Sequence, residues 1–204
     1  MNPQLFIGQS DSTIPGVVVF WLVFYVWVGS EFFIGWKLRP AAGSVATDAG
    51  SRSLLISSIW LGIAIGFALA FAVPAAAFVS GRRTLFYLGI ALMVVGLAFR
   101  WYSIRVLGSS FTYVVHTRPD QQVVEKGPYR WIRHPSYTGA LLTIVGVFVA
   151  LTNPLSFLGL IPPLAGYTYR IRVEESALVR DLGEKLRLRA ADLVGAAGRR
   201  GRFL

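Results

Sequence analysis

One short segment of the sequence gathers the residue types that bind a charged ligand with a flat ring. It reads Gly-Pro-Tyr-Arg-Trp-Ile-Arg-His-Pro-Ser-Tyr-Thr-Gly over residues 127–139. A proline disfavours helical geometry in the residue before it and suits the first helical position, so His134 is predicted to cap a helix that begins at Pro135. The amides of such a helix end, expected here to face solvent, bind carboxylates or phosphates. Further donors and flat faces come from Arg133, Tyr129, Trp131 and Tyr137. A nucleoside with a charged amino-acid tail would suit this combination.

A second cluster of charged residues lies further along the chain, at Arg170, Arg172, Glu174 and Glu175. Arg170 and Glu174 are four residues apart, so on a helix they share one face. A pair of this kind on an exposed surface contributes only a few tenths of a kcal/mol. Beside the helix end at Pro135, however, the same pair could form one wall of a binding site.

The composition indicates an integral membrane protein. Of the 204 residues, 54% are hydrophobic and only 15% are charged, whereas soluble domains are about a quarter charged. The net charge is +10, and the Lys and Arg residues flank apolar stretches, which favours membrane topology and contact with anionic lipid over nucleic-acid binding. The sequence has no cysteine, which excludes disulfides, thiolate metal sites and cysteine nucleophiles, and no metal site is expected.

The hydrophobic pattern predicts an all-α membrane protein with about five transmembrane helices. The last two apolar stretches are short and meet at Asn153-Pro154, so we expect them to form a helical hairpin that either crosses or re-enters the bilayer. Pro74 is expected to kink the second helix, and Arg100 to snorkel to the interface as an anchor. The expected spans are Ile14–Trp36, Leu54–Val79, Thr84–Leu107, Tyr137–Leu151 and Leu155–Tyr169.

The chain divides into three expected regions. Residues 1–107 hold three transmembrane helices, and residues 108–189 form a catalytic region with a polar loop, the hairpin and an amphipathic interfacial helix from Arg170. Residues 190–204 are expected to be disordered. The loops after the first and third spans are basic. This predicts that both loops and the cofactor pocket lie in the cytoplasm and that the N-terminus lies outside. The bias toward Ala, Gly and Arg suggests a bacterial inner membrane.

The two clusters together resemble the signature of the isoprenylcysteine carboxyl methyltransferases and the related membrane phospholipid methyltransferases. That signature is Arg-His-Pro-x-Tyr-x-Gly, followed after a hydrophobic hairpin by Glu-Glu. Here it reads Arg133 to Gly139 and then Glu174-Glu175, and the similarity extends from Gly108 to about Glu184. Beyond that point the family continues with tyrosines and a basic, proline-containing end, and this chain has no tyrosine and no proline after Glu184.

The resemblance implies that the cofactor is S-adenosylmethionine and assigns roles to individual residues. Glu174 would bind the cofactor and Arg170 would hold the carboxylate of the substrate, and these two are the predicted catalytic residues. The remaining cofactor-binding residues would be His116, Gln121, Gln122, Val123, Val124, Tyr129, His134, Pro135, Ser136 and Tyr137.

The predicted function is therefore methyl transfer to a lipophilic acceptor, most simply the carboxylate of an isoprenylated cysteine or a similar isoprenoid acid. A carboxylate is already ionised at pH 7 and needs no general base. Three alternatives stay open. A phospholipid amine could be the acceptor, with His134 or Glu174 as base. An NADPH-dependent enone or sterol reductase has a similar layout but usually an acid after Tyr-x-Gly, where Ala140 and Leu141 stand here. A non-enzymatic lipid-binding membrane protein would use the Arg-His-Pro segment only as an interfacial anchor.

Overall fold

The computed structural model describes residues 14–37, 50–108 and 126–177, and all regular secondary structure within these ranges is helical. Residues 161–177 continue directly from the last 3₁₀ helix and are called here the 161–177 helix. The preceding elements are α2 (Ile14–Lys37), α3 (Ser51–Ala72), η2 (Pro74–Ala76), α4 (Arg82–Leu107), η4 (Gly127–Arg130), α5 (Pro135–Ala150) and η5 (Pro154–Leu160).

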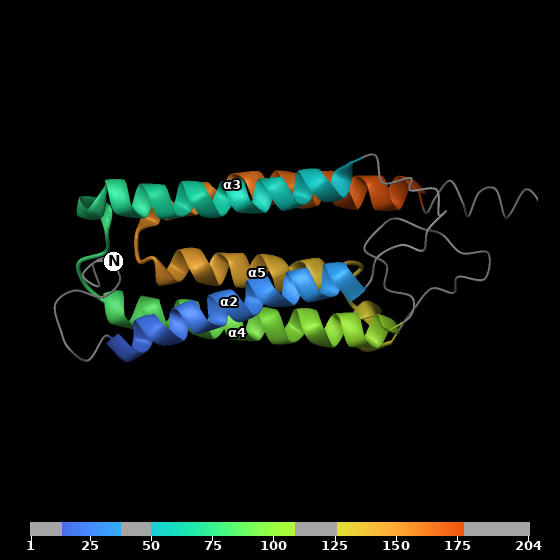
Figure 1. The fold of residues 1–204 in the computed structure, drawn as a ribbon, viewed down its shortest axis with the longest axis horizontal. Helices are drawn as coiled ribbons and strands as arrows, with labels where there is room; N and C mark the ends of the chain where they lie inside the picture. Colours follow the sequence, from blue (N-terminus) through green and yellow to red (C-terminus); the bar gives the residue numbers. More distant parts are fainter. Residues whose placement is uncertain (1–13, 38–49, 109–125, 178–204) are drawn as a thin grey trace, which may run out of the picture.

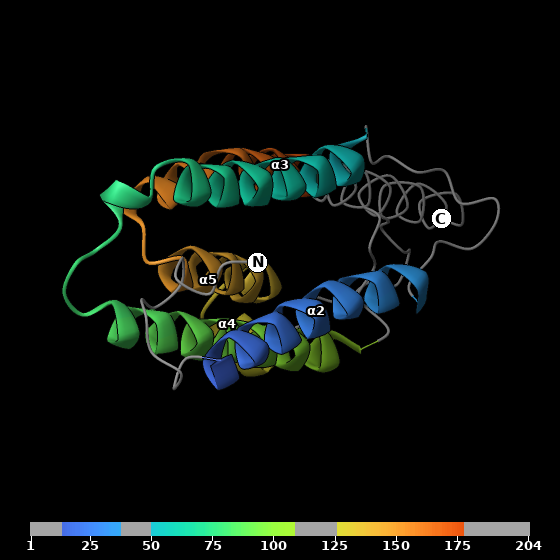
Figure 2. The same cartoon turned by 60° about the vertical axis from the view of Figure 1, so that its left-hand side comes forward.

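The longest helical segments, α2, α3, α4, α5 and the 161–177 helix, run alternately in opposite directions along a bundle (Figure 1). α3 and the 161–177 helix form one layer, α2 and α4 form the opposite layer, and α5 lies between the two, as Figure 2 confirms. The C-terminal ends of α2, α4 and the 161–177 helix lie at the same end of the bundle as the first residues of α3 and α5. The predicted site residues in the first turn of α5 and near the end of the 161–177 helix therefore lie at the same end of the bundle.

α2, α3 and α4 are each long and apolar enough to cross a membrane. In α2 the side chains of one face are buried in the bundle and those of the other face are exposed. Phe20, Phe24 and Trp27 are buried on one face, whereas Leu22 and Tyr25 are 61% and 65% exposed on the other. A helix that is apolar all round yet exposed on one side is typical of a membrane span whose outer face meets lipid. α5 is apolar but has only 16 residues, about 24 Å at 1.5 Å per residue.

α4 and α5 approach each other very closely because small residues line their interface. A side chain at Gly96 would lie 2.6 Å from the backbone nitrogen of Thr143, and one at Gly139 would lie 2.6 Å from the backbone nitrogen of Arg100. Only glycine permits this backbone contact, as is common between helices in membranes. The close approach brings the middle of α4 against the first turns of α5, where the sequence motif lies.

The two arms of the predicted hairpin pack against different partners. α5 packs on α4, whereas η5 and the 161–177 helix pack on α3, where a side chain at Gly62 would collide with the carbonyl oxygen of Gly159. Asn153 organises the turn between the arms: its Oδ1 accepts a hydrogen bond from the amide of Leu155, and its Nδ2 donates to the carbonyl of Val73. The predicted turn at Asn153-Pro154 is confirmed.

Three expectations about the helices are wrong. α3 ends at Ala72, and Pro74 begins the separate 3₁₀ helix η2 instead of kinking a longer span. No separate interfacial helix begins at Arg170, because the 161–177 helix runs through that residue without a break. Arg100 does not reach the interface as an anchor, since it is only 4% exposed and lies inside the bundle. The expected disordered tail, residues 190–204, lies outside the described residues.

Candidate active site

The first turn of α5 is built by the proline that the sequence places there. His134 is the N-cap, with φ −125° and ψ 60°, and Pro135 follows at the first helical position, as predicted. The carbonyl of His134 accepts hydrogen bonds from the amides of Tyr137 and Thr138, each at 3.1 Å. These two amides thus already donate hydrogen bonds within the helix. The expectation that the amides after Pro135 are free to bind an anionic ligand is therefore wrong for Tyr137 and Thr138.

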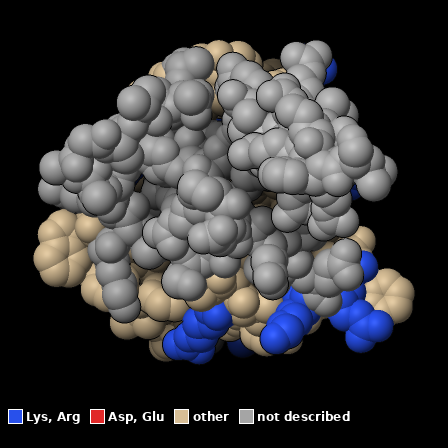
Figure 3. Space-filling view, turned by 90° about the vertical axis from the view of Figure 1, so that its right-hand side faces the viewer, with Lys and Arg blue, Asp and Glu red and all other residues tan. Residues whose placement is uncertain are grey.

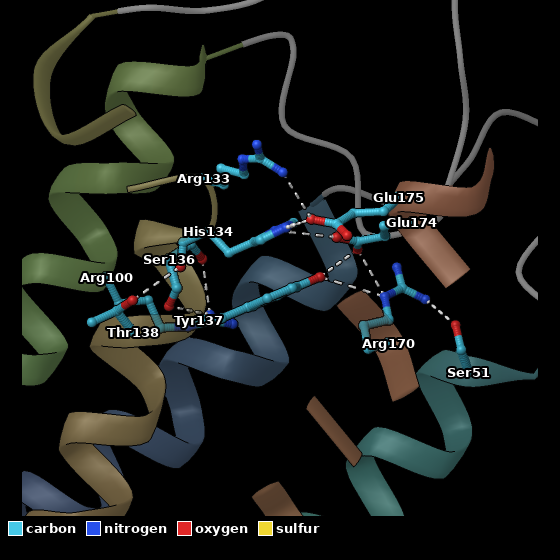
Figure 4. A network of polar contacts seen from close by, with 10 residues as sticks. All are labelled: Ser51, Arg100, Arg133, His134, Ser136, Tyr137, Thr138, Arg170, Glu174 and Glu175. Atoms are coloured by element: carbon cyan, nitrogen blue, oxygen red, sulfur yellow. Dashed lines mark hydrogen bonds and ion pairs between the residues drawn. The ribbon is translucent and has the colours of Figure 1, made fainter. Parts of the chain in front are cut away.

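Glu174 connects the 161–177 helix to α5. The Tyr137 hydroxyl donates a hydrogen bond to Glu174 Oε1, and Arg170 Nε donates to the same oxygen at 2.9 Å. His134 Nδ1 lies 3.7 Å from the other oxygen, Oε2. Figure 4 shows these side chains converging on Glu174 from the two helices. The residues of both sequence motifs therefore meet in space, as the resemblance requires.

Arg170 is buried and held from a third element. It is 3% exposed, and its Nη1 donates a hydrogen bond of 2.6 Å to the hydroxyl of Ser51, the first residue of α3. Ser51 is itself fully buried. On the 161–177 helix the inward face carries Tyr167, Arg170 and Ala177, each of them buried. The inward face thus presents the polar cluster, and the apolar residues Ile171 and Val173 are half-buried.

His134 extends the cluster toward the surface. Its ring stacks on that of Tyr137, with centroids 5.6 Å apart and an interplanar angle of 5°. Its Nε2 lies 3.5 Å from Glu175 Oε1, and Arg133 Nη1 lies 3.8 Å from the same oxygen. The Arg133 side chain is 88% exposed, so this outer pair contributes less than about 1 kcal/mol. Glu175 was not among the predicted site residues, although it directly follows Glu174.

Ser136 faces the opposite side of α5, away from Glu174 (Figure 4). Its hydroxyl and its carbonyl oxygen accept hydrogen bonds from Arg100 Nη1, at 3.0 and 3.1 Å. The same guanidinium pairs with Glu31 of α2, through contacts of 2.5 and 2.6 Å. The sequence analysis missed this link. Glu31 is the only charge inside the first apolar stretch, and a search for a partner at matching depth in another span would have suggested Arg100.

Tyr129, in η4, is half-buried beside the cluster. Burial raises the pKa of Tyr129 to about 12, with nearby Arg100 lowering that pKa and Glu174 raising it. Its phenol is therefore neutral at physiological pH and offers a hydroxyl and an apolar ring. The other predicted cofactor residues, His116, Gln121, Gln122, Val123 and Val124, lie outside the described residues.

Comparison with known proteins agrees with this arrangement. Residues 89–180, from α4 through the 161–177 helix, match the model of the isoprenylcysteine carboxyl methyltransferase family. A probable protein-S-isoprenylcysteine O-methyltransferase of Oryza sativa subsp. indica is 33% identical over 133 residues, which cover 63% of this chain and 66% of the relative. The protein-S-isoprenylcysteine O-methyltransferase of Saccharomyces cerevisiae is 38% identical over 95 residues, 45% of this chain and 40% of the relative.

A solved structure has a similar fold. The eukaryotic intramembrane Ras methyltransferase, an isoprenylcysteine carboxyl methyltransferase, superimposes with a TM-score of 0.54 and 25% sequence identity, covering 84% of this chain and 63% of the other. The aligned regions thus span two thirds or less of the length of these relatives. The family match over residues 89–180 includes Arg170, Glu174 and the first turn of α5.

Proposed function

We propose that this integral membrane protein is a member of the isoprenylcysteine carboxyl methyltransferase family, to which it is similar over residues 89–180, and a methyltransferase that uses S-adenosylmethionine. The proposed acceptor is the carboxylate of an isoprenylated cysteine or of a similar isoprenoid acid. The observation that carries the proposal is the convergence of Tyr137 and Arg170 on one oxygen of Glu174, at the end of the bundle where α5 begins.

The side chains around Glu174 suit the groups of the cofactor. S-adenosylmethionine supplies a methyl group activated on a cationic sulfur. Glu174 would accept the ammonium of its amino-acid tail, because its carboxylate is already oriented by two donors. His134 and Arg133 would approach the carboxylate of that tail from the surface side. Two aromatic faces, those of Tyr129 and the 83% exposed Trp131, are available for the adenine ring.

Arg170 is the residue best placed to hold an acceptor carboxylate. Its guanidinium is rigid, permanently charged and fixed by both Ser51 and Glu174. A carboxylate acceptor is ionised at pH 7 and attacks without a general base. The residues then need only to orient the two reactants and exclude water, which can contribute about 7–11 kcal/mol of the barrier.

The membrane arrangement that we propose has five crossings, with the site on the cytoplasmic side. η5 and the 161–177 helix together form 24 consecutive helical residues, about 14 Å of 3₁₀ helix and 25 Å of α-helix. That length supports a full crossing by the second arm of the hairpin. Exposed Arg105, Lys126, Arg130 and Arg133 lie near the site end, and Figure 3 shows Lys and Arg along the lower edge of this face. Basic residues of this kind favour the cytoplasmic side.

One observation favours a second acceptor class. His134 lies between Glu174 and Glu175, with Nδ1 3.7 Å from a Glu174 oxygen and Nε2 3.5 Å from a Glu175 oxygen, so a carboxylate stands beside each of its ring nitrogens. This arrangement would let His134 take the proton released when an amine is methylated. Phospholipid amine methylation is therefore the runner-up.

Transfer of an isotope-labelled methyl group tests the proposal. The purified protein is incubated with labelled S-adenosylmethionine and, in parallel, prenylcysteine analogues, the same analogues with their carboxylate already esterified, and total lipid extract. We expect base-labile label in the free-carboxylate analogue alone. Label in lipid amines would support the runner-up instead. No transfer to any acceptor, together with NADPH oxidation by an enone, would show that the protein is a reductase.

A further inference from the structure

Arg100 is a buried cation that the proposed chemistry does not use. It lies in α4, a candidate membrane span, and is 4% exposed. A charge in such a place is costly unless it is paired, and charged residues inside membrane spans commonly serve function. The question is what its pairing accomplishes.

The guanidinium of Arg100 connects three helices. Its Nε and Nη2 face the two carboxylate oxygens of Glu31 in α2, at 2.5 and 2.6 Å. Its Nη1 donates to the hydroxyl and the carbonyl oxygen of Ser136 in α5, at 3.0 and 3.1 Å. A planar fork can bind a carboxylate on one side while donating to a neighbour on the other, which a lysine ammonium cannot do with the same geometry.

Ser136 occupies a sensitive position in α5. It stands between His134 and Tyr137, the two residues of this turn whose side chains face Glu174 (Figure 4). Successive helical residues are rotated by about 100°, so fixing Ser136 on the α4 side also fixes the direction in which His134 and Tyr137 point. The close contact at Gly139, one turn further on, keeps the backbone of α5 against Arg100.

We propose that Arg100, oriented by Glu31, is a positioning residue for the cofactor site. It holds the first turn of α5 at the rotation that aims His134 and Tyr137 at Glu174. The inference rests on the proposed function, because it assumes that this turn binds the cofactor. Under this proposal Ser136 supports the cofactor site through its hydrogen bonds with Arg100 and does not contact the cofactor directly.

Arg100→Lys is the informative variant because it keeps the buried charge beside Glu31 but loses the fork that reaches Ser136. We expect the dissociation constant of S-adenosylhomocysteine, measured by calorimetry on the purified protein, to rise about tenfold. The matched control is Thr143→Val, at the same α4–α5 interface two turns away. Thr143 is fully buried and its hydroxyl donates to the carbonyl of Gly139 at 3.0 Å. This control should lower the unfolding midpoint and leave the dissociation constant within twofold.

Ser136→Ala, which changes volume little, keeps the test decisive if Arg100→Lys does not fold. We expect it to raise the dissociation constant about threefold or more, on the scale of one lost hydrogen bond. Where Arg100→Lys folds, the two effects should not add in the double variant, because both substitutions remove the same link. Full additivity would mean that Ser136 contacts the ligand directly, and it would overturn the inference.

The wild-type measurement separates the inference from the proposed function. If the wild-type protein binds S-adenosylhomocysteine but Arg100→Lys and Ser136→Ala bind it within twofold of wild type, Arg100 is only a stabilising residue. If the wild-type protein neither binds this ligand nor transfers a methyl group, the proposed function fails and the inference fails with it.

Discussion

The hydroxyl of Tyr137 donates a hydrogen bond to the carboxylate of Glu174, joining the first turn of α5 to the 161–177 helix. The residues are 37 positions apart, with a turn at Asn153-Pro154 between them. Arg170 donates to the same oxygen of Glu174. One carboxylate is thus oriented by a neutral and a charged donor from two elements, which is a suitable arrangement for receiving a cationic group.

Replacing Tyr137 by Phe removes this hydrogen bond and keeps the ring. A hydrogen bond to a charged group contributes about 1.5–3 kcal/mol, so we expect the dissociation constant of S-adenosylhomocysteine to rise about tenfold or more. The control is Tyr169→Phe, in the 161–177 helix, where the side chain is 40% exposed. Calorimetry that gives the same constant for Tyr137→Phe and Tyr169→Phe would exclude Tyr137 from the site.

Ser51 offers a way to disturb Arg170 without touching Glu174. Because Arg170 also donates to Glu174, truncating Arg170 itself would affect both ligands. Ser51→Ala removes the buried 2.6 Å contact to Nη1 and leaves the Arg170–Glu174 pair in place. We expect the Michaelis constant of the carboxylate acceptor to rise several-fold, about 1 kcal/mol, while cofactor affinity changes less than twofold.

Ser53→Ala, two residues further along α3, is the matched control. Steady-state kinetics with each substrate varied in turn make the comparison. Equal changes in both constants would show that Ser51 supports the whole site and that Arg170 has no separate role in acceptor binding.

The close approach of α4 and α5 gives a stability prediction. A methyl group added at Gly96 would lie 2.6 Å from the backbone nitrogen of Thr143 and 2.7 Å from the carbonyl oxygen of Gly139. Backbone atoms cannot move aside easily, so Gly96→Ala should cost about 1–3 kcal/mol or more. Gly29→Ala in α2 is the control, because nothing lies within 4 Å of the added group. Thermal unfolding in detergent should show a lower midpoint for Gly96→Ala and little change, or a small rise, for Gly29→Ala.

The parts of this structure that follow from local sequence were predictable. The proline after His134 predicts the cap, four-residue spacing predicts the Arg170–Glu174 pair, and runs of apolar residues predict the spans. Contacts between distant segments were not. Ser51 and Arg170 are 119 residues apart, and Arg100 and Ser136 are 36 apart. Their pairing depends on which helices pack together, and that is decided by small residues such as Gly62 and Gly139.

The assignment of Arg100 shows the same limit. An arginine near the end of an apolar stretch is usually an interfacial anchor, and the local sequence gives no other indication. Only the packing of α2 beside α4 brings Glu31 within 2.6 Å and turns an apparent anchor into a buried pair. Ser136 likewise belongs to the motif by sequence, while its hydroxyl faces away from Glu174.

The last prediction concerns topology. The end of α2 and the start of α3, which flank residues 38–49, lie at the same end of the bundle as the end of α4 and the start of α5, which lie on either side of residues 109–125. With five crossings both loops must face the same compartment. Because the chain has no cysteine, single cysteines report position without background. We expect Ser44→Cys and Gln121→Cys to be protected from a membrane-impermeant maleimide in intact cells and labelled after permeabilisation. Val79→Cys, at a 97% exposed position between η2 and α4, should be labelled in intact cells.

Labelling of Ser44→Cys and Gln121→Cys from opposite sides would contradict the five-crossing arrangement. Labelling of both in intact cells, with Val79→Cys protected, would keep the five crossings but reverse the orientation and place the site outside.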